Sequence, residues 1–305
     1  MSAALAWGGV LLAGVLWGIG AIVAQWLIGR GMSPRSLALA RFSLGLPLLW
    51  WWHLRRSRSA NSGARWQSLA GGERLQVVAT GAATALAVTC WFQGIAVLGA
   101  GLPTLISICL APVIVALASV QRGYERLTNR LIVAMTMALT GVGLMVWPAG
   151  GLVLPAGYAA GVTWSIASAF AQALVVLGNA RMPARLPAVT ASAWGMTAAC
   201  ACMLAVVVPQ GVTWPSAGPD WLGVGYTGVV TTSLAYLVFA TSARRLTPTA
   251  SIIGIMVEPL VAMLLAGWLF AQAPSVSQWA GAALLCAAVG LISRQQDAAT
   301  AVSTS

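Results

Sequence analysis

Charged side chains are scarce in this chain of 305 residues. It has no lysine, sixteen arginines, one histidine and five acidic residues, so only 7% of its residues are charged. A soluble globular domain carries roughly 25%. Because 59% of the residues are hydrophobic, a soluble fold would lack the polar side chains needed to cover its surface. The composition therefore predicts a membrane protein.

These scarcities also exclude several kinds of activity. A P-loop places a lysine on the nucleotide phosphates, so the chain does not encode a nucleotide-driven pump of its own. The only histidine is His53, and neither an HExxH nor a GxSxG motif occurs. The five cysteines lie in apolar runs, and their spacing fits no zinc framework. We expect no metal and no cofactor.

Apolar runs of bilayer length fill nearly the whole chain. A spanning helix needs about 20 mostly apolar residues, and the runs do not alternate with period two as barrel strands do. The ten predicted spans cover approximately residues 5–28, 35–53, 75–98, 101–120, 130–148, 155–178, 187–208, 221–243, 248–270 and 276–293. The prediction is an all-α polytopic membrane protein with ten transmembrane helices.

The arginines are distributed unevenly between the two sides of this map. If the N-terminus is cytoplasmic, the cytoplasmic loops carry thirteen of them and the opposite loops carry only Arg30 and Arg35. This asymmetry follows the positive-inside rule, so we expect both termini to be cytoplasmic. The thirteen are Arg55, Arg56, Arg58, Arg65, Arg74, Arg122, Arg126, Arg130, Arg181, Arg185, Arg244, Arg245 and Arg294. The same asymmetry explains the net charge of +11 without a nucleic-acid partner.

The two halves of the sequence resemble each other at a constant shift. Residues 13–19 read AGVLWGI and residues 160–166 read AGVTWSI, a shift of 147 positions. The same shift pairs Thr84 with Thr231 and Pro112 with Pro259. Residues 1–150 and 151–305 are therefore predicted to be two repeats of five spans each. Because five is odd, the second repeat enters the membrane from the opposite side, and such inverted repeats are typical of secondary transporters.

Two ionisable residues, Arg41 and Glu258, lie within predicted spans. A charge inside a membrane is costly, so it usually faces a cavity or a partner. We interpret Glu258 as a binding group for a substrate ammonium or a coupling proton, and Arg41 as a binding group for a carboxylate. The structural alternative is that either residue only holds the bundle together. Pro259 follows Glu258 directly and should bend the ninth span.

Four aromatic residues also lie inside spans, away from the interfaces. Trp17 and Trp164 are repeat mates, and Trp91 and Tyr236 lie in the third and eighth spans. Aromatic faces can line a cavity and bind apolar or cationic groups. Packing between helices is the alternative explanation. The candidate substrate-binding residues are Glu258, Arg41, Trp17, Trp164, Trp91 and Tyr236.

Several short motifs, in this order and spacing, give the chain a family resemblance. They are Leu16-Trp17-Gly18, Ala40-Arg41-Phe42, Ala111-Pro112, Glu125-Arg126-Leu127-Thr128, Tyr236 and Glu258-Pro259. With these motifs the chain resembles the EamA-type branch of the drug/metabolite transporter superfamily over about residues 5–293. The resemblance implies a transporter of small metabolites in the bacterial inner membrane, often an exporter of amino acids or related compounds. It also implies a central cavity surrounded by the first four helices of each repeat, with the fifth and tenth helices at the periphery.

The leading hypothesis is thus a secondary transporter that works by alternating access. An intramembrane enzyme and a channel or helical scaffold are the alternatives. Turnover of a membrane substrate would support the enzyme, and saturable flux with counterflow would separate a transporter from a channel. The expected partners are a small-molecule substrate, membrane lipids and a coupling proton, and the chain is expected to act as a monomer or homodimer.

Overall fold

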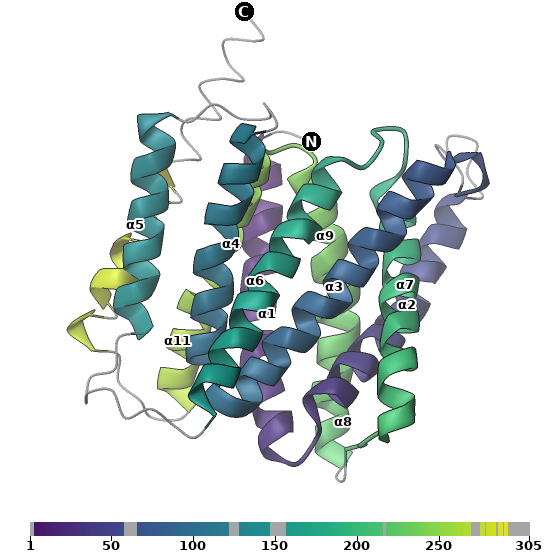
Figure 1. The fold of residues 1–305 in the computed structure, drawn as a ribbon, viewed down its shortest axis with the longest axis horizontal. Coiled ribbons are helices and arrows are strands. Elements are labelled where there is room, and N and C mark those ends of the chain that lie inside the picture. The colour runs from purple at the N-terminus through teal and green to yellow at the C-terminus, as the bar shows by residue number, and fades with distance from the viewer. Residues whose placement is uncertain are drawn as a thin grey trace, which may run out of the picture.

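The computed structural model describes residues 3–57, 66–121, 128–146, 157–215, 218–269 and 275–291, except positions 278, 285 and 289. Every regular element in these ranges is helical (Figure 1). Five described segments are long and apolar enough to cross a membrane: Ala4–Gly29, Gly71–Leu98, Tyr158–Ala180, Ala188–Gln210 and Gly218–Ala243. The predicted all-α membrane fold is confirmed. Part of the predicted basic loop, residues 58–65, lies outside the described residues.

The first repeat forms five helices and a short 3₁₀ turn. They are α1 (Ala3–Gly29), α2 (Pro34–Ser57), η1 (Trp66–Ser68), α3 (Gly71–Leu98), α4 (Gly101–Gln121) and α5 (Asn129–Val146). The joint between α3 and α4 is only two residues long, and Gly99 makes the turn with a φ of 75°. Glycine adopts this left-handed conformation without steric cost. Helices α3 and α4 are therefore antiparallel neighbours.

The second repeat has the same order of spans, with two irregular ones. Its elements are α6 (Tyr158–Ala180), α7 (Ala188–Val207), η2 (Val208–Gln210), α8 (Gly218–Gly225), the π-helical η3 (Tyr226–Leu234), α9 (Ala235–Ala243), α10 (Pro248–Ile255) and α11 (Val257–Leu269). Helices α8, η3 and α9 form one span, and α10 and α11 form the next. The described positions between 276 and 291 are helical as well.

The two repeats are inverted. In Figure 1, α1 begins at the upper end of the bundle and runs downwards, whereas its repeat mate α6 begins at the lower end and runs upwards. Helix α2 ends with Arg55 and Arg56 at the upper end, which we call the arginine-rich end. The turn after α1, which contains Arg30, lies at the lower end, which we call the opposite end.

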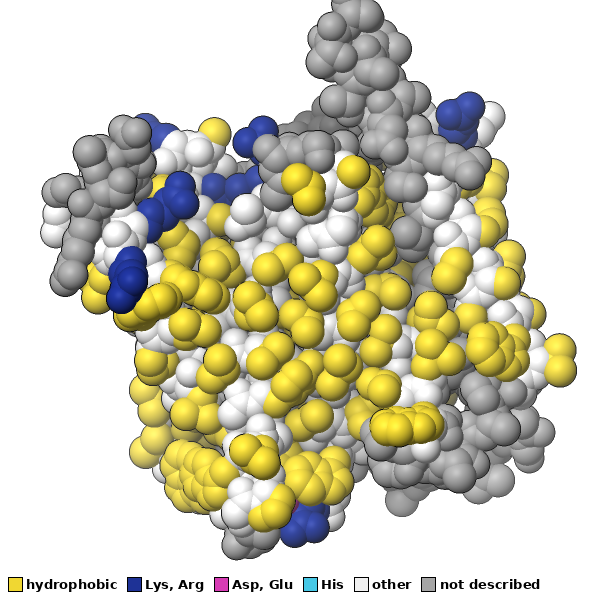
Figure 2. Space-filling view, turned by 180° about the vertical axis from the view of Figure 1, so that it is seen from behind, with side chains coloured by type: hydrophobic (Ala, Val, Ile, Leu, Met, Phe, Trp, Pro, Cys, Tyr) yellow, Lys and Arg dark blue, Asp and Glu magenta, His cyan; other side chains and the backbone are white. Residues whose placement is uncertain are grey.

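Helices from the two repeats interlock in the middle of the bundle. Helix α3 packs on α6 and α7, α2 packs on α7 and η3, and α1 packs on α9 and α11. Helix α5 packs on α4 at the left edge of the view in Figure 1, in line with the peripheral place that the family resemblance implies. The space-filling view in Figure 2 shows hydrophobic side chains over the middle of one face and basic side chains near its upper and lower margins. A lipid-facing surface has this distribution.

Two helix crossings between the repeats bring backbone directly against backbone. A Cβ atom at Gly81 of α3 would lie 2.9 Å from the Cα of Gly195 of α7. A Cβ atom at Gly45 of α2 would lie 2.9 Å from the carbonyl oxygen of Gly228 in η3. Gly81 and Gly228 are related by the repeat shift of 147, so the two crossings are repeat mates. Small residues at such crossings let membrane helices approach closely.

Candidate functional site

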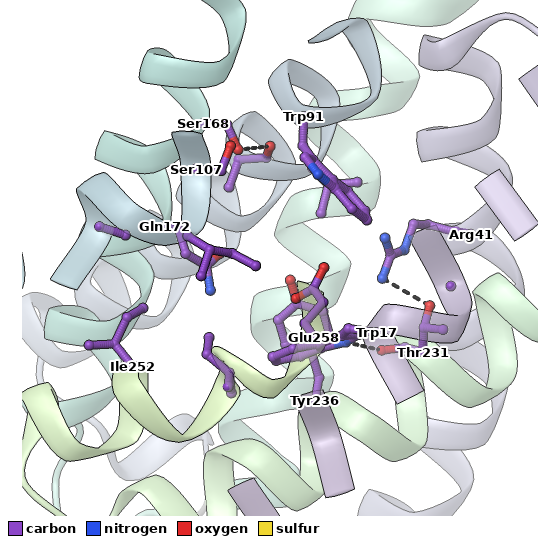
Figure 3. A pocket seen from close by; sticks show the side chains of 16 residues that line it. Trp17, Arg41, Trp91, Ser107, Ser168, Gln172, Thr231, Tyr236, Ile252 and Glu258 are labelled. Carbon is purple, nitrogen blue, oxygen red and sulfur yellow. Dashed lines mark hydrogen bonds between the residues drawn. The ribbon is translucent and has the colours of Figure 1, made fainter. Parts of the chain in front are cut away.

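A cavity lies in the middle of the bundle and is lined by both repeats (Figure 3). Its volume is about 70 Å³, which is enough for a few water molecules. Pockets for drug-sized ligands measure roughly 300–1,000 Å³. In this conformation the cavity therefore fits only a small molecule. Its lining includes Trp17, Arg41, Trp91, Ser107, Ala111, Ser168, Gln172, Thr231, Tyr236, Ile252 and Glu258.

Arg41 of α2 is held at the cavity wall by two threonines. Its side chain is buried, its Nε donates to the Thr232 hydroxyl at 2.8 Å and its Nη2 donates to the Thr231 hydroxyl at 2.9 Å. The guanidinium carbon lies 5.6 Å from the centre of the Phe92 ring, within cation–π range. A guanidinium group has five N–H donors, so Arg41 keeps donors for a ligand after these two bonds.

The π-helical turn of η3 explains why two consecutive threonines reach the same arginine. The hydroxyls of Thr231 and Thr232 both donate to the carbonyl of Thr227, at 2.5 and 2.9 Å. Their oxygen lone pairs are therefore free to accept from Arg41. In an α-helix, adjacent side chains diverge by about 100°, whereas the wider π turn lets both hydroxyls face one side.

Glu258 enters the cavity from a break in the ninth span. Pro259 has no N–H, so the carbonyl of Ile255 loses its helical partner, and α10 ends before Met256. The Met256 N–H bonds to the carbonyl of Ile253, three residues back, at 3.1 Å, as in a 3₁₀ turn. The bend expected at Pro259 is thus present as a break. It places Glu258 in the first turn of α11, with its side chain buried at the cavity.

Two glycines of α1 make room for this break. A Cβ atom at Gly14 would lie 3.1 Å from the carbonyl oxygen of Ile255, and one at Gly18 would lie 2.6 Å from the carbonyl oxygen of Glu258. Gly14 and Gly18 are four residues apart and face the same side of α1. The close contact of α1 with α11 therefore holds the Glu258 backbone against the first repeat.

The two charged residues face one cavity without forming a direct ion pair. Arg41 comes from the first repeat and Glu258 from the second, and Figure 3 shows both side chains projecting into the same space. Within the described part of the chain they form no direct ion pair, and the Glu258 carboxylate has no hydrogen-bond partner. A molecule in this cavity therefore meets a cationic group and an anionic group at separate places.

Three of the four predicted aromatic residues line the cavity. The Trp17 indole N–H donates to the Thr231 carbonyl at 2.9 Å, and its ring lies 4.9 Å from the Tyr236 ring. The Trp91 indole N–H donates to the Thr104 hydroxyl at 2.9 Å. These bonds fix the ring orientations, so that Trp17, Tyr236 and Trp91 form parts of the wall.

Trp164 does not join them. Its side chain is 39% exposed and it is absent from the cavity lining. Helix α6 instead turns its small hydroxyl residues inwards. Ser168 donates to the Ala87 carbonyl at 2.9 Å, and the Ser107 hydroxyl of α4 donates to the Ser165 carbonyl at 3.1 Å.

The cavity is also asymmetric in charge. Ala111 is the repeat mate of Glu258 and lines the same cavity, but it carries no acid. Sequence reasoning did not identify Thr231, Thr232, Ser107 and Ser168 as parts of the site. Serine and threonine are common inside apolar spans, so only the structure separates those that face a cavity from those that bond to their own helix.

Two cross-repeat ion pairs lie at the ends of the bundle. At the arginine-rich end, Nη2 of Arg185 lies 2.6 Å from Oε1 of Glu73, which also caps α3 by accepting the Ala70 N–H at 2.9 Å. At the opposite end, Nε of Arg30 lies 2.7 Å from Oδ1 of Asp220. The Asp220 side chain is 2% exposed, whereas that of Glu73 is 26% exposed. Both pairs join one repeat to the other.

Comparison with known proteins is consistent with this architecture. The model of the EamA-like transporter family matches the chain twice, over residues 4–147 and 159–294. A crystal structure described only as that of a protein is similar with a TM-score of 0.74, at 18% identity over 95% of this chain and 96% of that chain. No curated protein sequence matches the chain. The structural likeness concerns the fold alone.

Proposed function

Because the chain belongs to the EamA-like transporter family, we propose that it is a secondary transporter that moves small zwitterionic metabolites, such as amino acids, through the central cavity by alternating access. Members of this family are transporters, so the intramembrane-enzyme alternative is set aside. The proposal includes export across the bacterial inner membrane, with the arginine-rich end in the cytoplasm. The excess of arginine at that end supports this orientation.

The placement of Arg41 and Glu258 carries the proposal of a zwitterionic substrate. A carboxylate accepts paired N–H donors from a guanidinium group, and Arg41 retains donors beyond its two threonine bonds. An ammonium group is attracted to the Glu258 carboxylate and to the faces of Trp17 and Tyr236. A substrate with both groups neutralises two buried charges at once. One with a single charge leaves the other uncompensated, which is costly in a membrane interior.

Glu258 also suits proton coupling. It has no hydrogen-bond partner among the described residues and it faces the cavity. When the substrate ammonium leaves, a proton can take its place and keep the site neutral. Exchange of substrate for proton at one carboxylate makes the two fluxes interdependent.

The cross-repeat ion pairs support alternating access. The pair Glu73–Arg185 joins the repeats at one end, and Arg30–Asp220 joins them at the other. Opening the cavity towards one end requires separating the repeats there and thus breaking that pair. The remaining pair keeps the other end closed, which prevents a continuous pore.

The test is counterflow in proteoliposomes with the purified chain. An amino acid is compared with its N-acetyl derivative, which lacks the ammonium, and with its methyl ester, which lacks the carboxylate. We expect the wild type to exchange the free amino acid and to discriminate against both derivatives. Glu258→Gln should lose the discrimination against the N-acetyl derivative, and Arg41→Gln should lose that against the ester.

A matched control is Arg130→Gln, which removes one charge from an exposed position on α5. This variant should behave like the wild type. Equal loss of activity towards all three compounds in both cavity variants would mean that Arg41 and Glu258 are structural. Flux without saturation or counterflow would identify a channel.

A further inference from the structure

A second cavity, distinct from the central one, lies at the arginine-rich end. We call it the arginine basin, and it has a volume of about 980 Å³. Three segments that are far apart in the sequence form it: residues 52–56 in the last two turns of α2, residues 184–189 before and at the start of α7, and residues 237–245 in α9 and just after it. Its lining contains Arg55, Arg56, Arg185, Arg244 and Arg245 and no acidic residue.

The positive-inside rule explains why arginines lie at this end of the bundle, but it does not explain why five of them surround one basin. Like charges at close range repel each other. Glu73 offsets only Arg185. Arg244 donates to the carbonyl of Leu186, and Arg55 stacks on Trp51 at 4.4 Å from the ring centre. These contacts orient the guanidinium groups but leave their charges uncompensated.

Arg56 and Arg245 form no ion pair within the described part of the chain. Partial burial lowers the pKa of the neighbouring Arg244 below its ordinary value, although an arginine remains charged at physiological pH. The basin therefore holds an excess of positive charge, of which the Arg244 guanidinium is partly desolvated. An anion that binds several guanidinium groups at once would offset it.

The walls of the basin indicate what else the ligand carries. Trp52, Val189 and Leu237 contribute apolar surface next to the guanidinium groups. On the outer side of α2, Trp51 and Leu54 are 46% and 50% exposed. Figure 2 shows basic side chains at the upper margin of the molecule directly above a face of hydrophobic side chains. A ligand with a phosphate head and an apolar body matches this arrangement.

We infer that the arginine basin binds the headgroup of an anionic phospholipid. Guanidinium groups bind phosphate oxygens in pairs, and basic pockets between membrane helices on the positive side bind such headgroups. The adjacent tryptophans of α2 place the basin at the level of the membrane interface. Because the basin is built from α2 of the first repeat and α7 and α9 of the second, the bound headgroup bridges the repeats.

The test measures thermal stabilisation of the full chain in phosphatidylcholine nanodiscs as the fraction of phosphatidylglycerol is raised. We expect a saturable rise in the unfolding temperature. Arg56→Gln and Arg245→Gln should each weaken the apparent affinity roughly fivefold, which corresponds to the contribution of one arginine near a membrane surface. Arg130→Gln removes the same charge outside the basin and should leave the affinity unchanged.

Three results would overturn the inference. The first is an unfolding temperature that does not change as phosphatidylglycerol replaces phosphatidylcholine. The second is equal weakening by Arg130→Gln, which would mean that the whole end attracts anions without a site. The third is equal stabilisation by inorganic phosphate or glycerol phosphate in phosphatidylcholine nanodiscs, which would identify a soluble phosphate as the ligand. Each variant is compared with the wild type in phosphatidylcholine alone, so that a loss of fold is distinguished from a loss of binding.

Discussion

Glu73 and Asp220 occupy the same position in the two repeats, and each forms an ion pair with an arginine of the other repeat. Both are the third residue of the third span, and they differ by the repeat shift of 147. Because the repeats are inverted, the two pairs lie at opposite ends of the bundle. The pairs are thus related by the same pseudo-symmetry as the helices, but they differ in burial.

The difference in burial predicts unequal effects of mutation. Asp220→Asn leaves Arg30 without its anion and a buried amide in place of a carboxylate, so we expect the free energy of unfolding to fall by about 1–3 kcal/mol. Glu73→Gln affects an exposed pair and should change stability little. Thermal unfolding of the purified variants measures both effects. The charge exchange Arg30→Asp with Asp220→Arg should recover part of the loss, and no recovery would show that the contact is not electrostatic.

The two repeat-mate tryptophans provide a matched pair of variants. Trp17 lines the cavity and Trp164 is exposed. Trp17→Ala removes an aromatic face from the site and should weaken the apparent substrate affinity by up to about 30-fold, because a desolvated cation–π contact contributes about 2 kcal/mol. Trp164→Ala should leave the affinity unchanged. Counterflow measured over a range of substrate concentrations distinguishes them, and equal weakening would remove Trp17 from the site.

The threonines of η3 should act through Arg41. In Thr231→Val or Thr232→Val, one acceptor for the guanidinium group is lost while the shape of the side chain is retained. We expect a higher KM for substrates that carry a carboxylate and an unchanged response to their methyl esters. The corresponding serine variants keep the hydroxyl and should restore the KM. A serine variant as impaired as the valine variant would show that packing, and not the hydrogen bond, is the cause.

The backbone crossing at Gly81 leaves no space for a side chain. Gly81→Ala would drive a methyl group into the Gly195 backbone, which cannot move as a flexible side chain would, and overpacking of this kind costs about 1–3 kcal/mol. Gly8→Ala is the control, because a Cβ atom there has no neighbour within 4 Å. Unfolding temperatures of both variants test this prediction. A Gly81→Ala protein as stable as Gly8→Ala would contradict the close crossing.

The orientation in the membrane can be tested by cysteine labelling in a background without the native cysteines. We expect Gln67→Cys, at the arginine-rich end, to be protected from an impermeant reagent in intact cells, because the excess of arginine predicts a cytoplasmic location. Trp214→Cys, at the opposite end and 58% exposed in the wild type, should react. The reverse labelling pattern would show that the chain has the opposite orientation in the membrane. Asn61, in the middle of the predicted basic loop, lies outside the described residues.

The sequence predicted the number of spans, the inverted repeat and the two intramembrane charges, because each depends on features that can be recognised from the order of residues along the chain. Span length reflects bilayer thickness, and a charge in an apolar run is visible wherever it faces. The direction in which a side chain points cannot be recognised from the sequence in this way. Lipid and protein core are both apolar, so the pattern along α6 does not reveal that Ser165 and Ser168 face inwards and Trp164 outwards. The equivalent Trp17 faces the cavity, and only packing against α9 and η3 decides this.

The π-helical turn in η3 was equally hidden. It lets two adjacent hydroxyls accept hydrogen bonds from one arginine, which requires a change in helical period that no single residue predicts. The break at Met256 was easier to anticipate, since Pro259 removes a specific hydrogen bond. Local chemistry could therefore be predicted where one residue causes it, and not where it arises from contacts between two spans.

The paired glycine crossings give the bundle two points about which helices of one repeat can tilt against helices of the other. At each crossing, Gly81 on Gly195 and Gly45 on Gly228, no side chain separates the two helices. Glu73 lies eight residues from Gly81, and Asp220 lies eight residues from Gly228, so each acidic residue is about 12 Å along its helix from the crossing. A helix tilt of about 10° moves a residue at that distance by about 2 Å, which is enough to break an ion pair. Arg41 lies four residues from Gly45, about 6 Å along the helix, so the same tilt moves it by only about 1 Å, half as far as the acidic residues.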